Sequence, residues 1–423
     1  MSDHSLLFES PPRGWVPACL NDVCIRVKDT ALPSAGGERF YIGLEHLASG
    51  FPVLVGRGKE SEVRSGKTAF RKGDVLFGKL RPYLRKSVLV DDAGICSTDI
   101  LVLRATERCI PELLCLLTHT DEFIGHAKAT TSGVQHPRTS WTALREFKFF
   151  VPPLPEQQNI AGVLGIVRQA IEQQERLTVL TTELKKMLLH QLFTHGLRGE
   201  PQKQTEIGPV PESWELVELG SIATKVSKGS SPRWQGFEYV SNGVMFVRSQ
   251  NVGVGRVDFS DRVYLPDSFN KKEKRSILKN EDILINLVGA SIGRVALGTP
   301  EIEGANCNQA VCFVRIDRPR SLKEFIVFYL LSPVGQQQMF FQKKDMARAN
   351  LSLLDVRTFK LPLPKADEVC KIAEALTTIE RKLEAYEKKR SVLFELFRTL
   401  LYQLMTAQIR VHNLDLTELE ITQ

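Results

Sequence analysis

The sequence LLHQLFT, from Leu188 to Thr194, returns near the end of the chain as LLYQLMT, from Leu400 to Thr406. The two stretches begin 212 residues apart and agree at five of their seven positions. Internal similarity at a long, fixed shift is typical of a duplicated architecture, and it constrains the fold more firmly than local propensity does. This repeat therefore decides how the rest of the chain is divided.

Further landmarks recur in the same order at nearly the same shift. Pro153-Leu154-Pro155 is matched by Pro362-Leu363-Pro364, and KGDVLFGKL from Lys72 is matched loosely by KNEDILINL from Lys279. The two opening segments also correspond, with RGWVPACL around Trp15 and ESWELVEL around Trp214. Chance similarity of short motifs is the alternative, but the common order and near-constant spacing favour a duplicated unit with small insertions.

Each repeat begins with a strand-rich region. The first contains the β-like runs GDVLFGKL, ICSTDILVLRA and FKFFV, and the second contains VMFVRSQNV, EDILINLVG and NQAVCFVRI. Gly, Pro, Asp and Ser clusters separate these runs, and one helix is expected in each repeat, at 111–120 and at 322–331. The pattern predicts two similar α+β domains.

After Pro155 and Pro364 the apolar periodicity lengthens from two to about three and a half, which is typical of long paired helices. In the second helix only Arg390 interrupts a series of apolar a and d positions: Ile372, Leu376, Ile379, Leu383, Tyr386, Leu393, Phe397, Leu400 and Leu404. The same register in the first helix is apolar at its ends and polar in its middle: Ile160, Leu164, Val167, Ile171, Gln174, Thr178, Thr181, Lys185, Leu188 and Leu192. A neighbouring seam runs beside the polar middle: Leu177, Leu180, Leu184 and Met187.

Helices of this length, roughly 55 Å at 1.5 Å per residue, must pack on each other or on a partner. We therefore expect an α+β protein in which two similar domains are joined by two long helices packed as an antiparallel coiled coil, with a pseudo-two-fold internal repeat. The predicted segments are two domains, two helices and a tail: 1–151, 152–199, 200–361, 362–410 and 411–423. An ordinary helical core of a fused protein remains the alternative.

The amino-acid composition indicates which class of protein and which kind of partner fit this chain. The 423 residues are 43% hydrophobic, and Lys and Arg outnumber Asp and Glu by 56 to 49, a mild basic excess that suits nucleic acid. The eight cysteines are scattered, as in a reduced cytoplasmic protein. No signal peptide or apolar run of membrane-spanning length occurs, so a cytoplasmic location is expected.

Catalytic motifs are not found. A methyltransferase would carry an Asn/Asp-Pro-Pro-aromatic loop, whereas this chain has only Val151-Pro152-Pro153-Leu154. The carboxylates Asp99, Glu281 and Asp282 do not form the cluster that a metal-dependent nuclease needs, and no Walker-type phosphate loop is present. The histidines have no ligand-like spacing. We expect a chain without catalytic residues, bound metal or cofactor of its own.

Several loops have the composition of DNA-reading segments, which present Arg, Lys, Asn and Gln to base edges and phosphates. The first repeat offers GKLRPYLRK and TTSGVQHPRTSW, with Lys79, Arg81, Tyr83, Arg85, Lys86, Gln135, His136 and Arg138. The second offers KGSSPRWQG, VRSQNVG, GASIGR and DMARANLS, with Arg233, Arg248, Gln250, Asn251, Arg294, Arg348 and Asn350. Any one of these loops can be a plain solvated turn, but their occurrence at corresponding places favours DNA contact.

Taken together, these features resemble the specificity (S) subunit of type I restriction-modification systems over nearly the whole chain. PPLPEQQNIAGVLGIVRQAIEQQERL is similar to the central spacer of that family, and KGDVLFGKLRPYLRK is similar to its target-recognition domain. The second spacer departs from the pattern, because LPLPKADEVCKIAEAL lacks the Glu-Gln-Gln of the first. Its partner contacts are correspondingly less well defined.

The resemblance implies a division of labour. Each target-recognition domain would read one half of a bipartite double-stranded DNA target, while the helices set the gap and dock two modification (methyltransferase) subunits, with the seam Leu177, Leu180, Leu184 and Met187 as the docking residues. Restriction (motor and nuclease) subunits would join them. S-adenosylmethionine, ATP and Mg would act on those partners, and this chain would be non-catalytic. A DNA-binding regulator without methyltransferase partners, and a stand-alone nuclease or methyltransferase, are the alternatives.

Overall fold

The computed structural model describes residues 12–341 and 350–411. Contacts divide the chain into two compact units: a first unit of Met1–Gln174 with Lys389–Gln423, and a second unit of Glu175–Lys388. Each long helix therefore contributes one half to each unit. Within the described residues, no helix is both long enough and apolar enough to cross a membrane.

The first unit is built on a four-stranded antiparallel sheet. In sheet order its strands are β2 (Cys24–Val27), β10 (Ile100–Ala105), β7 (Asp74–Gly78) and β8 (Ser87–Leu89). Successive side chains of β7 lie on opposite faces of the sheet: Val75 and Phe77 pack with the helices, and Leu76 packs toward a second sheet. Because both faces are covered, the strand is apolar throughout rather than alternating.

Two further strand groups and two main helices complete this unit, beside the short α1 (Leu20–Val23) and α4 (Trp141–Leu144). The second sheet has the order β3 (Thr30–Ala31), β6 (Lys67–Phe70), β9 (Gly94–Cys96), β4 (Phe40–Ile42), β5 (Gly58–Lys59), and β1 (Val16–Cys19) pairs with β11 (Lys148–Val151). The main helices are α2 (Pro111–Leu117) and α3 (Asp121–Ala129). The predicted helix at 111–120 is thus α2, and α3 was not foreseen.

The second unit repeats this topology. Its four-stranded sheet has the order β15 (Lys225–Lys228), β21 (Val311–Arg315), β18 (Ile283–Asn286), β19 (Val295–Leu297). The smaller groups are β17 (Tyr264–Leu265), β16 (Val244–Val247) and β20 (Asn306–Cys307), and the pair β14 (Glu215–Glu218) with β22 (Lys360–Leu363). The main helices are α7 (Asp267–Lys272), α8 (Arg320–Leu331), α9 (Pro333–Phe341) and α10 (Leu353–Thr358). The predicted helix at 322–331 is α8. The duplication is confirmed in the four-stranded sheets and in the pairs β1–β11 and β14–β22, whereas the other sheet has five strands in the first unit and three in the second. The second unit also contains the hairpin β12 (Gln202–Thr205) with β13 (Gly208–Pro211).

A buried ion pair recurs at the same place in both sheets. Asp74, at the start of β7, receives Nε and Nη2 of Arg104, each at 2.8 Å. Asp282, directly before β18, receives the same two atoms of Arg315 at 2.8 and 2.7 Å. Both carboxylates are buried, so these bidentate bonds replace the water that the charges lost on folding.

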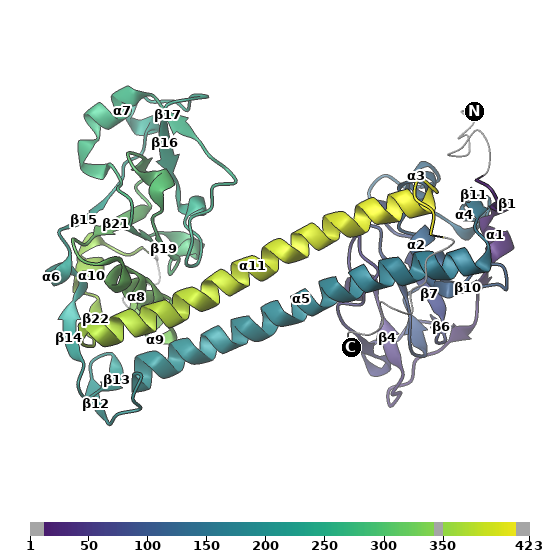
Figure 1. The fold of residues 1–423 in the computed structure, drawn as a ribbon, viewed down its shortest axis with the longest axis horizontal. Helices are drawn as coiled ribbons and strands as arrows, with labels where there is room; N and C mark the ends of the chain where they lie inside the picture. The colour runs from purple at the N-terminus through teal and green to yellow at the C-terminus, as the bar shows by residue number, and fades with distance from the viewer. Residues whose placement is uncertain (1–11, 342–349, 412–423) are drawn as a thin grey trace. The chain divides into compact units, whose positions relative to one another are not determined.

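The long helices are α5 (Leu154–His195) and α11 (Ala366–Met405), and they run antiparallel within each unit (Figure 1). In the first unit Leu164 and Ile171 of α5 share a core with Phe397 and Leu404 of α11. In the second unit the opposite ends meet, and Leu192 of α5 shares a core with Ile372 and Leu376 of α11. The apolar ends predicted for both helices are confirmed as core.

The polar middle of α5 keeps the helix-facing register. Gln174 is buried, Thr178 and Thr181 are half-buried, and the Lys185 ammonium bonds to the Glu380 carboxylate of α11. The apolar seam beside it points outward instead, with Leu177, Leu180, Leu184 and Met187 between 39% and 69% exposed. The stripe that faces α11 therefore keeps one register along α5. Polar residues simply occupy its central part.

Replacing Asp282 by Ala should lower the free energy of unfolding by roughly 3–5 kcal/mol, because the half-buried Arg315 guanidinium is left without its partner. Urea unfolding followed by circular dichroism measures the change. Lys371→Ala, which removes an exposed pair with Asp367 on α11, is the control and should cost no more than about 0.5 kcal/mol. Equal losses in the two variants would contradict a structural role for the buried pair.

Candidate nucleic-acid interface

In the first unit two of the predicted DNA-reading loops lie against each other. The loop after β7 and the loop before α4 (Trp141–Leu144) are joined by an isolated bridge between Leu80 and Arg138. The Arg81 N–H donates to the Pro137 carbonyl at 2.7 Å, and the Thr139 N–H donates to the Lys79 carbonyl at 3.1 Å. Backbone pairing thus brings residues about 60 positions apart onto one surface.

Arg138 is held there by a carboxylate that the sequence analysis treated as isolated. Its Nε and Nη2 donate to the two oxygens of Asp99 at 2.9 and 3.2 Å. These bonds lower the pKa of Asp99, and the charges of Lys79 and His136 act in the same direction. Lys79 and Arg138 therefore form a positive group around a single carboxylate, with His136 beside it. The local sequence does not indicate this ion pair, because Asp99 and Arg138 are 39 residues apart.

The loop after β7 has an unusual backbone. Arg81 and Arg85 flank a short 3-10 helix, Pro82–Leu84, and have φ values of 52° and 50°. This left-handed region is costly for residues other than glycine, and such conformations persist where the surrounding structure enforces them. The turn exposes Arg81 and the ring of Tyr83, while Gln135 and His136 are exposed on the adjoining loop.

Arg85 and Lys86 are predicted to contact DNA, but in the structure their side chains anchor this loop. Arg85 donates to the His119 carbonyl at 3.1 Å and bonds to the Asp121 carboxylate. The half-buried Lys86 ammonium donates to the Leu44 carbonyl at 2.6 Å. Their donors are directed into the protein, so Arg85 and Lys86 are less favourably placed for DNA contact than the exposed Arg81, and their DNA contact stays a prediction.

The second unit places its loops in the corresponding way. Val288, after β18, bridges to Asn350 before α10, just as Leu80 bridges to Arg138, and the Leu351 N–H donates to the Leu287 carbonyl at 2.8 Å. Asn350 is exposed. Arg348 lies outside the described residues. The same loop-to-loop arrangement is therefore present in both units.

Arg294 is exposed but faces an acidic helix surface. It lines a cleft of about 420 Å³ together with Arg256 and with Glu380, Glu384 and Glu387 of α11. The Arg256 guanidinium already pairs with Glu387 at 3.1 Å. A phosphate approaching Arg294 would meet these carboxylates, so Arg294 is less favourably placed than Asn350 for DNA contact.

The cluster at 248–251 is largely structural. Arg248 donates to the Asp261 carbonyl at 2.9 Å, and Gln250 donates to the Asp261 carboxylate at 2.6 Å. Asn251 is buried, donates to the carbonyls of Asp258 and Asp261, and accepts from the Arg248 N–H. Arg248 and Asn251 are therefore less favourably placed for DNA contact than the exposed Gln250, and the contact of all three stays a prediction. Arg233 is exposed on a separate turn, Arg233–Gln235.

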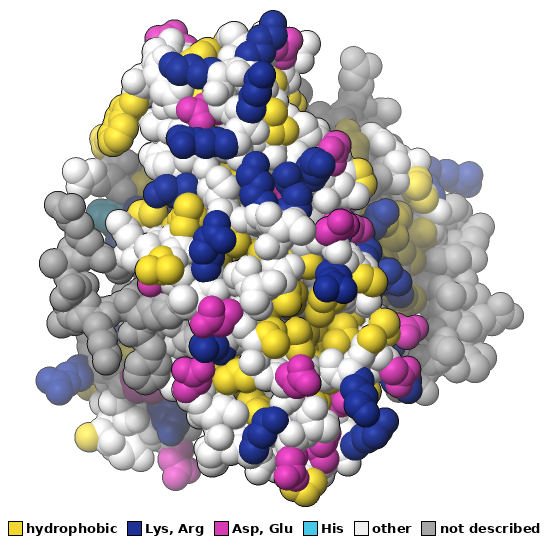
Figure 2. Space-filling view, turned by 90° about the vertical axis from the view of Figure 1, so that its left-hand side faces the viewer, with side chains coloured by type: hydrophobic (Ala, Val, Ile, Leu, Met, Phe, Trp, Pro, Cys, Tyr) yellow, Lys and Arg dark blue, Asp and Glu magenta, His cyan; other side chains and the backbone are white. Residues whose placement is uncertain are grey.

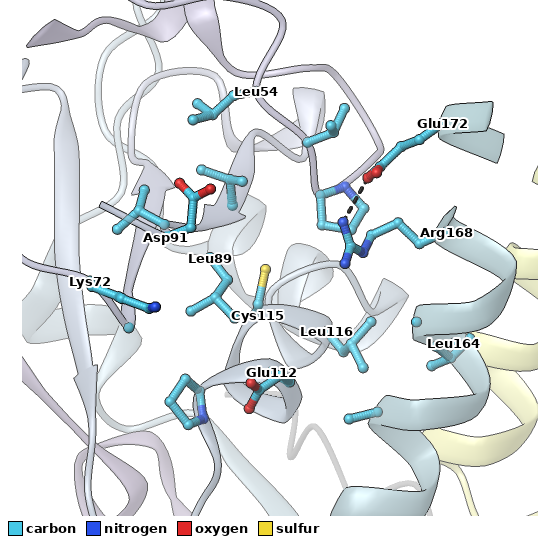
Figure 3. Close-up of a pocket in the computed structure, with 18 of the residues that line it drawn as sticks. Leu54, Lys72, Leu89, Asp91, Glu112, Cys115, Leu116, Leu164, Arg168 and Glu172 are labelled. Carbon is cyan, nitrogen blue, oxygen red and sulfur yellow. Dashed lines mark hydrogen bonds and ion pairs between the residues drawn. The ribbon is translucent and has the colours of Figure 1, made fainter. Parts of the chain in front are cut away.

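A cleft of about 500 Å³ lies elsewhere in the first unit (Figure 3). Helices α2 and α5 form one side, with Cys115 directed into the cleft, and Lys72 and Asp91 come from the sheet side. Burial raises the pKa of Cys115 to about 12, so the thiol is protonated at neutral pH and is a poor nucleophile. Arg168 is paired with Glu172 at 2.6 Å. In the described part of the chain, no group of three or more His, Cys, Asp or Glu could hold a metal ion.

The family model for the type I restriction modification DNA specificity domain matches residues 12–181 and 211–393, one match for each repeat. The chain belongs to this family. Curated relatives include the MjaVIII specificity subunit of Methanocaldococcus jannaschii, which is 25% identical over 338 residues, or 78% of this chain and 77% of the relative. The EcoBI specificity subunit of Escherichia coli is 25% identical over 318 residues, or 70% and 66% of the two chains.

Solved structures of the same family share the fold. The S subunit from M. genitalium superposes with a TM-score of 0.59 at 15% identity, covering 92% of this chain and 96% of that one. A chain from a structural study of type I system assembly gives a TM-score of 0.54 at 20% identity, covering 95% and 100%. The resemblance inferred from the spacer and the loop after β7 is thus confirmed, and family members recognise specific DNA sequences.

A buried histidine lies directly beneath the loop after β7. His119 Nε2 lies 3.0 Å from the Ser87 carbonyl, and its Nδ1 has no hydrogen-bond partner. Burial lowers the pKa of His119 to about 4, and the nearby positive charge of Arg85 acts in the same direction. The folded state therefore holds a neutral imidazole under a loop that carries candidate DNA contacts.

We predict that His119 lowers the stability of the folded state at acidic pH values that are still above the range in which carboxylates titrate. The unfolded chain binds a proton near pH 6.5 and the folded chain only near pH 4, so stability is complete above pH 6.5 and declines as the pH falls toward 4. Between about pH 7.5 and about pH 5 the loss should be roughly 2 kcal/mol. Urea unfolding of wild type and His119→Gln at both pH values measures it. A variant with the same pH dependence as wild type would refute this assignment.

Proposed function

We propose that this chain is the DNA-reading subunit of a type I restriction-modification complex and that each unit reads one half of a bipartite target. The observation that carries the proposal is the paired arrangement of loops, joined at Leu80 and Arg138 in one unit and at Val288 and Asn350 in the other. Duplicated domains can approach two half-sites in related orientations, as symmetric DNA-binding dimers do. The surfaces around these bridges are the proposed base-reading sites.

In the first unit Lys79, Arg81, Tyr83, Gln135, His136 and Arg138 are the proposed contacts, and in the second Arg233, Gln250 and Asn350. Arg138 is the strongest reader among them, because Asp99 fixes the plane of its guanidinium and leaves Nη1 free of that bond. A preoriented arginine fork is the side chain best suited to guanine O6 and N7. Lysines nearby supply the sequence-independent attraction to phosphate.

The long helices are the proposed spacer and docking element. Leu177, Leu180, Leu184 and Met187 follow helical spacing on the outward side of α5. An exposed apolar stripe of this kind marks a protein contact. We infer that a modification subunit packs on it, that a second modification subunit uses the related surface of α11, and that restriction subunits join them. S-adenosylmethionine, ATP and Mg would act on those cytoplasmic partners, so this chain would be non-catalytic.

Methylation mapping tests the reading function. Cells expressing the chain with its modification subunit should methylate adenines in a split motif, and cells lacking the chain should not. Arg138→Ala should relax or abolish one half of the motif, at a cost of about 1–3 kcal/mol in binding, and should leave the other half unchanged. Arg145→Ala, which removes an exposed pair with the adjacent Glu146, is the control. Specific DNA binding without chain-dependent methylation would instead favour a regulator without methyltransferase partners.

Leu184→Glu should abolish co-purification with the modification subunit, because a carboxylate would be placed in an apolar helix contact. The residue is 48% exposed, so the fold of the chain alone should not change. Ile25→Glu, at a 53% exposed position on the edge strand β2, is the matched control and should retain the partner. Retention by both variants would exclude the seam as the docking site.

A further inference from the structure

Trp234 lies on the turn that carries the proposed contact Arg233, and its own role is not yet assigned. Its side chain is 91% exposed, whereas Trp15 and Trp214 are buried and Trp141 is half-buried. Indole is the largest side chain and combines an apolar face with a polar N–H, which is why tryptophan is enriched in binding surfaces. A fully solvated indole at the end of a turn is therefore a candidate contact residue.

The turn that carries Trp234 is rigid. The N–H groups of Gln235 and Phe237 both donate to the Pro232 carbonyl, at 2.9 and 3.0 Å, and Gly236 closes the turn with a φ of 77°. The Gln235 side chain donates to Ser230 Oγ and to Glu273 Oε1, each at 2.8 Å. Because this platform is already ordered, a ligand would lose little binding energy in fixing the indole.

A run of exposed cations lies beside the same platform. Gln235 ties the turn to the segment 271–275, in which Lys271, Lys272, Lys274 and Arg275 are exposed. The acid in that run, Glu273, is buried, and its carboxylate is directed to Gln235 and Arg275. Figure 2 shows Lys and Arg side chains gathered in the upper part of this face, where Figure 1 places α7 and β17.

We propose that Trp234 and the neighbouring cations Lys271, Lys272, Lys274 and Arg275 extend the proposed contact at Arg233 into a second DNA contact of the second unit, separate from the loop pair at Val288 and Asn350. The indole packs on deoxyribose or base, and the cations bind phosphates. This proposal rests on the proposed DNA-reading function and adds a contact to it. The positive charge favours DNA over a protein as the partner. The cores of protein interfaces are depleted in lysine, whereas lysine binds the phosphate backbone of DNA.

The first unit lacks an equivalent contact in the corresponding segment. After β2, the counterpart of β15, the segment 28–39 carries the exposed Leu32 and no aromatic residue, and Arg39 is tied to the buried Glu60 carboxylate at 2.6 Å. The guanidinium there stabilises the loop rather than extending from it. The indole contact is therefore specific to the half-target that the second unit reads.

Hydroxyl-radical footprinting of the complex with modification subunits tests this contact directly. Oxidation of the Trp234 peptide should be rapid in the complex without DNA and should fall several-fold when a duplex carrying the target is added, while the buried Trp214 stays protected throughout. Protection by the modification subunits before DNA is added would overturn the proposal in favour of a protein contact. Unchanged oxidation with DNA demonstrably bound would also overturn it, and would leave the reading function intact.

Affinity measurements supply an independent test. Trp234→Ala should weaken binding of the target duplex by about 10-fold, a loss typical of removing a tryptophan that is buried in an interface, and Trp234→Phe should recover most of the loss. Lys274→Ala should reduce the slope of log affinity against log salt by about 0.9. Ile25→Ala, an exposed apolar position on β2, should change neither quantity. Wild-type affinity and salt slope in both test variants would refute the contact.

Discussion

Neither long helix can bury its apolar ends without the other, and this constraint organises both units. The start of α5 and the end of α11 supply Leu164 and Phe397 to the first core, and the opposite ends supply Leu192 and Leu376 to the second. Each core therefore needs segments that are some 200 residues apart in the chain. Loop closure over such distances carries an entropic cost that only a large buried surface can offset.

Polar contacts complete the first unit where these segments meet. Glu156, at the start of α5, is buried and accepts from Trp15 Nε1 at 3.0 Å and from two nitrogens of Arg410 at 2.6 and 2.8 Å. Asn159 donates to the Val411 carbonyl at 2.7 Å. One carboxylate thus joins the N-terminal strand region, α5 and the segment after α11. Such a buried, fully bonded group fixes the register of the helices more sharply than apolar packing alone.

The sequence was informative about periodic features and uninformative about individual partners. Strands, helices and the duplication depend on patterns that extend over many residues, so they could be predicted from a single chain. The role of Arg138 depends on Asp99, and the burial of Asn251 depends on Asp258 and Asp261 across a turn. A loop has the same amino-acid composition whether its arginine or asparagine anchors the loop or extends from it. Only the tertiary contacts distinguish the two.

The same distinction explains how one fold can serve many DNA targets. The pairs Asp74 with Arg104 and Asp282 with Arg315 hold the strands from which the candidate loops depart. These pairs are buried, so changing them is costly, whereas exposed side chains such as those of Gln135 and Asn350 contribute little to folding. Loop residues can therefore change without loss of the scaffold, and the energetic separation between buried anchors and exposed readers lets target specificity vary while the architecture persists.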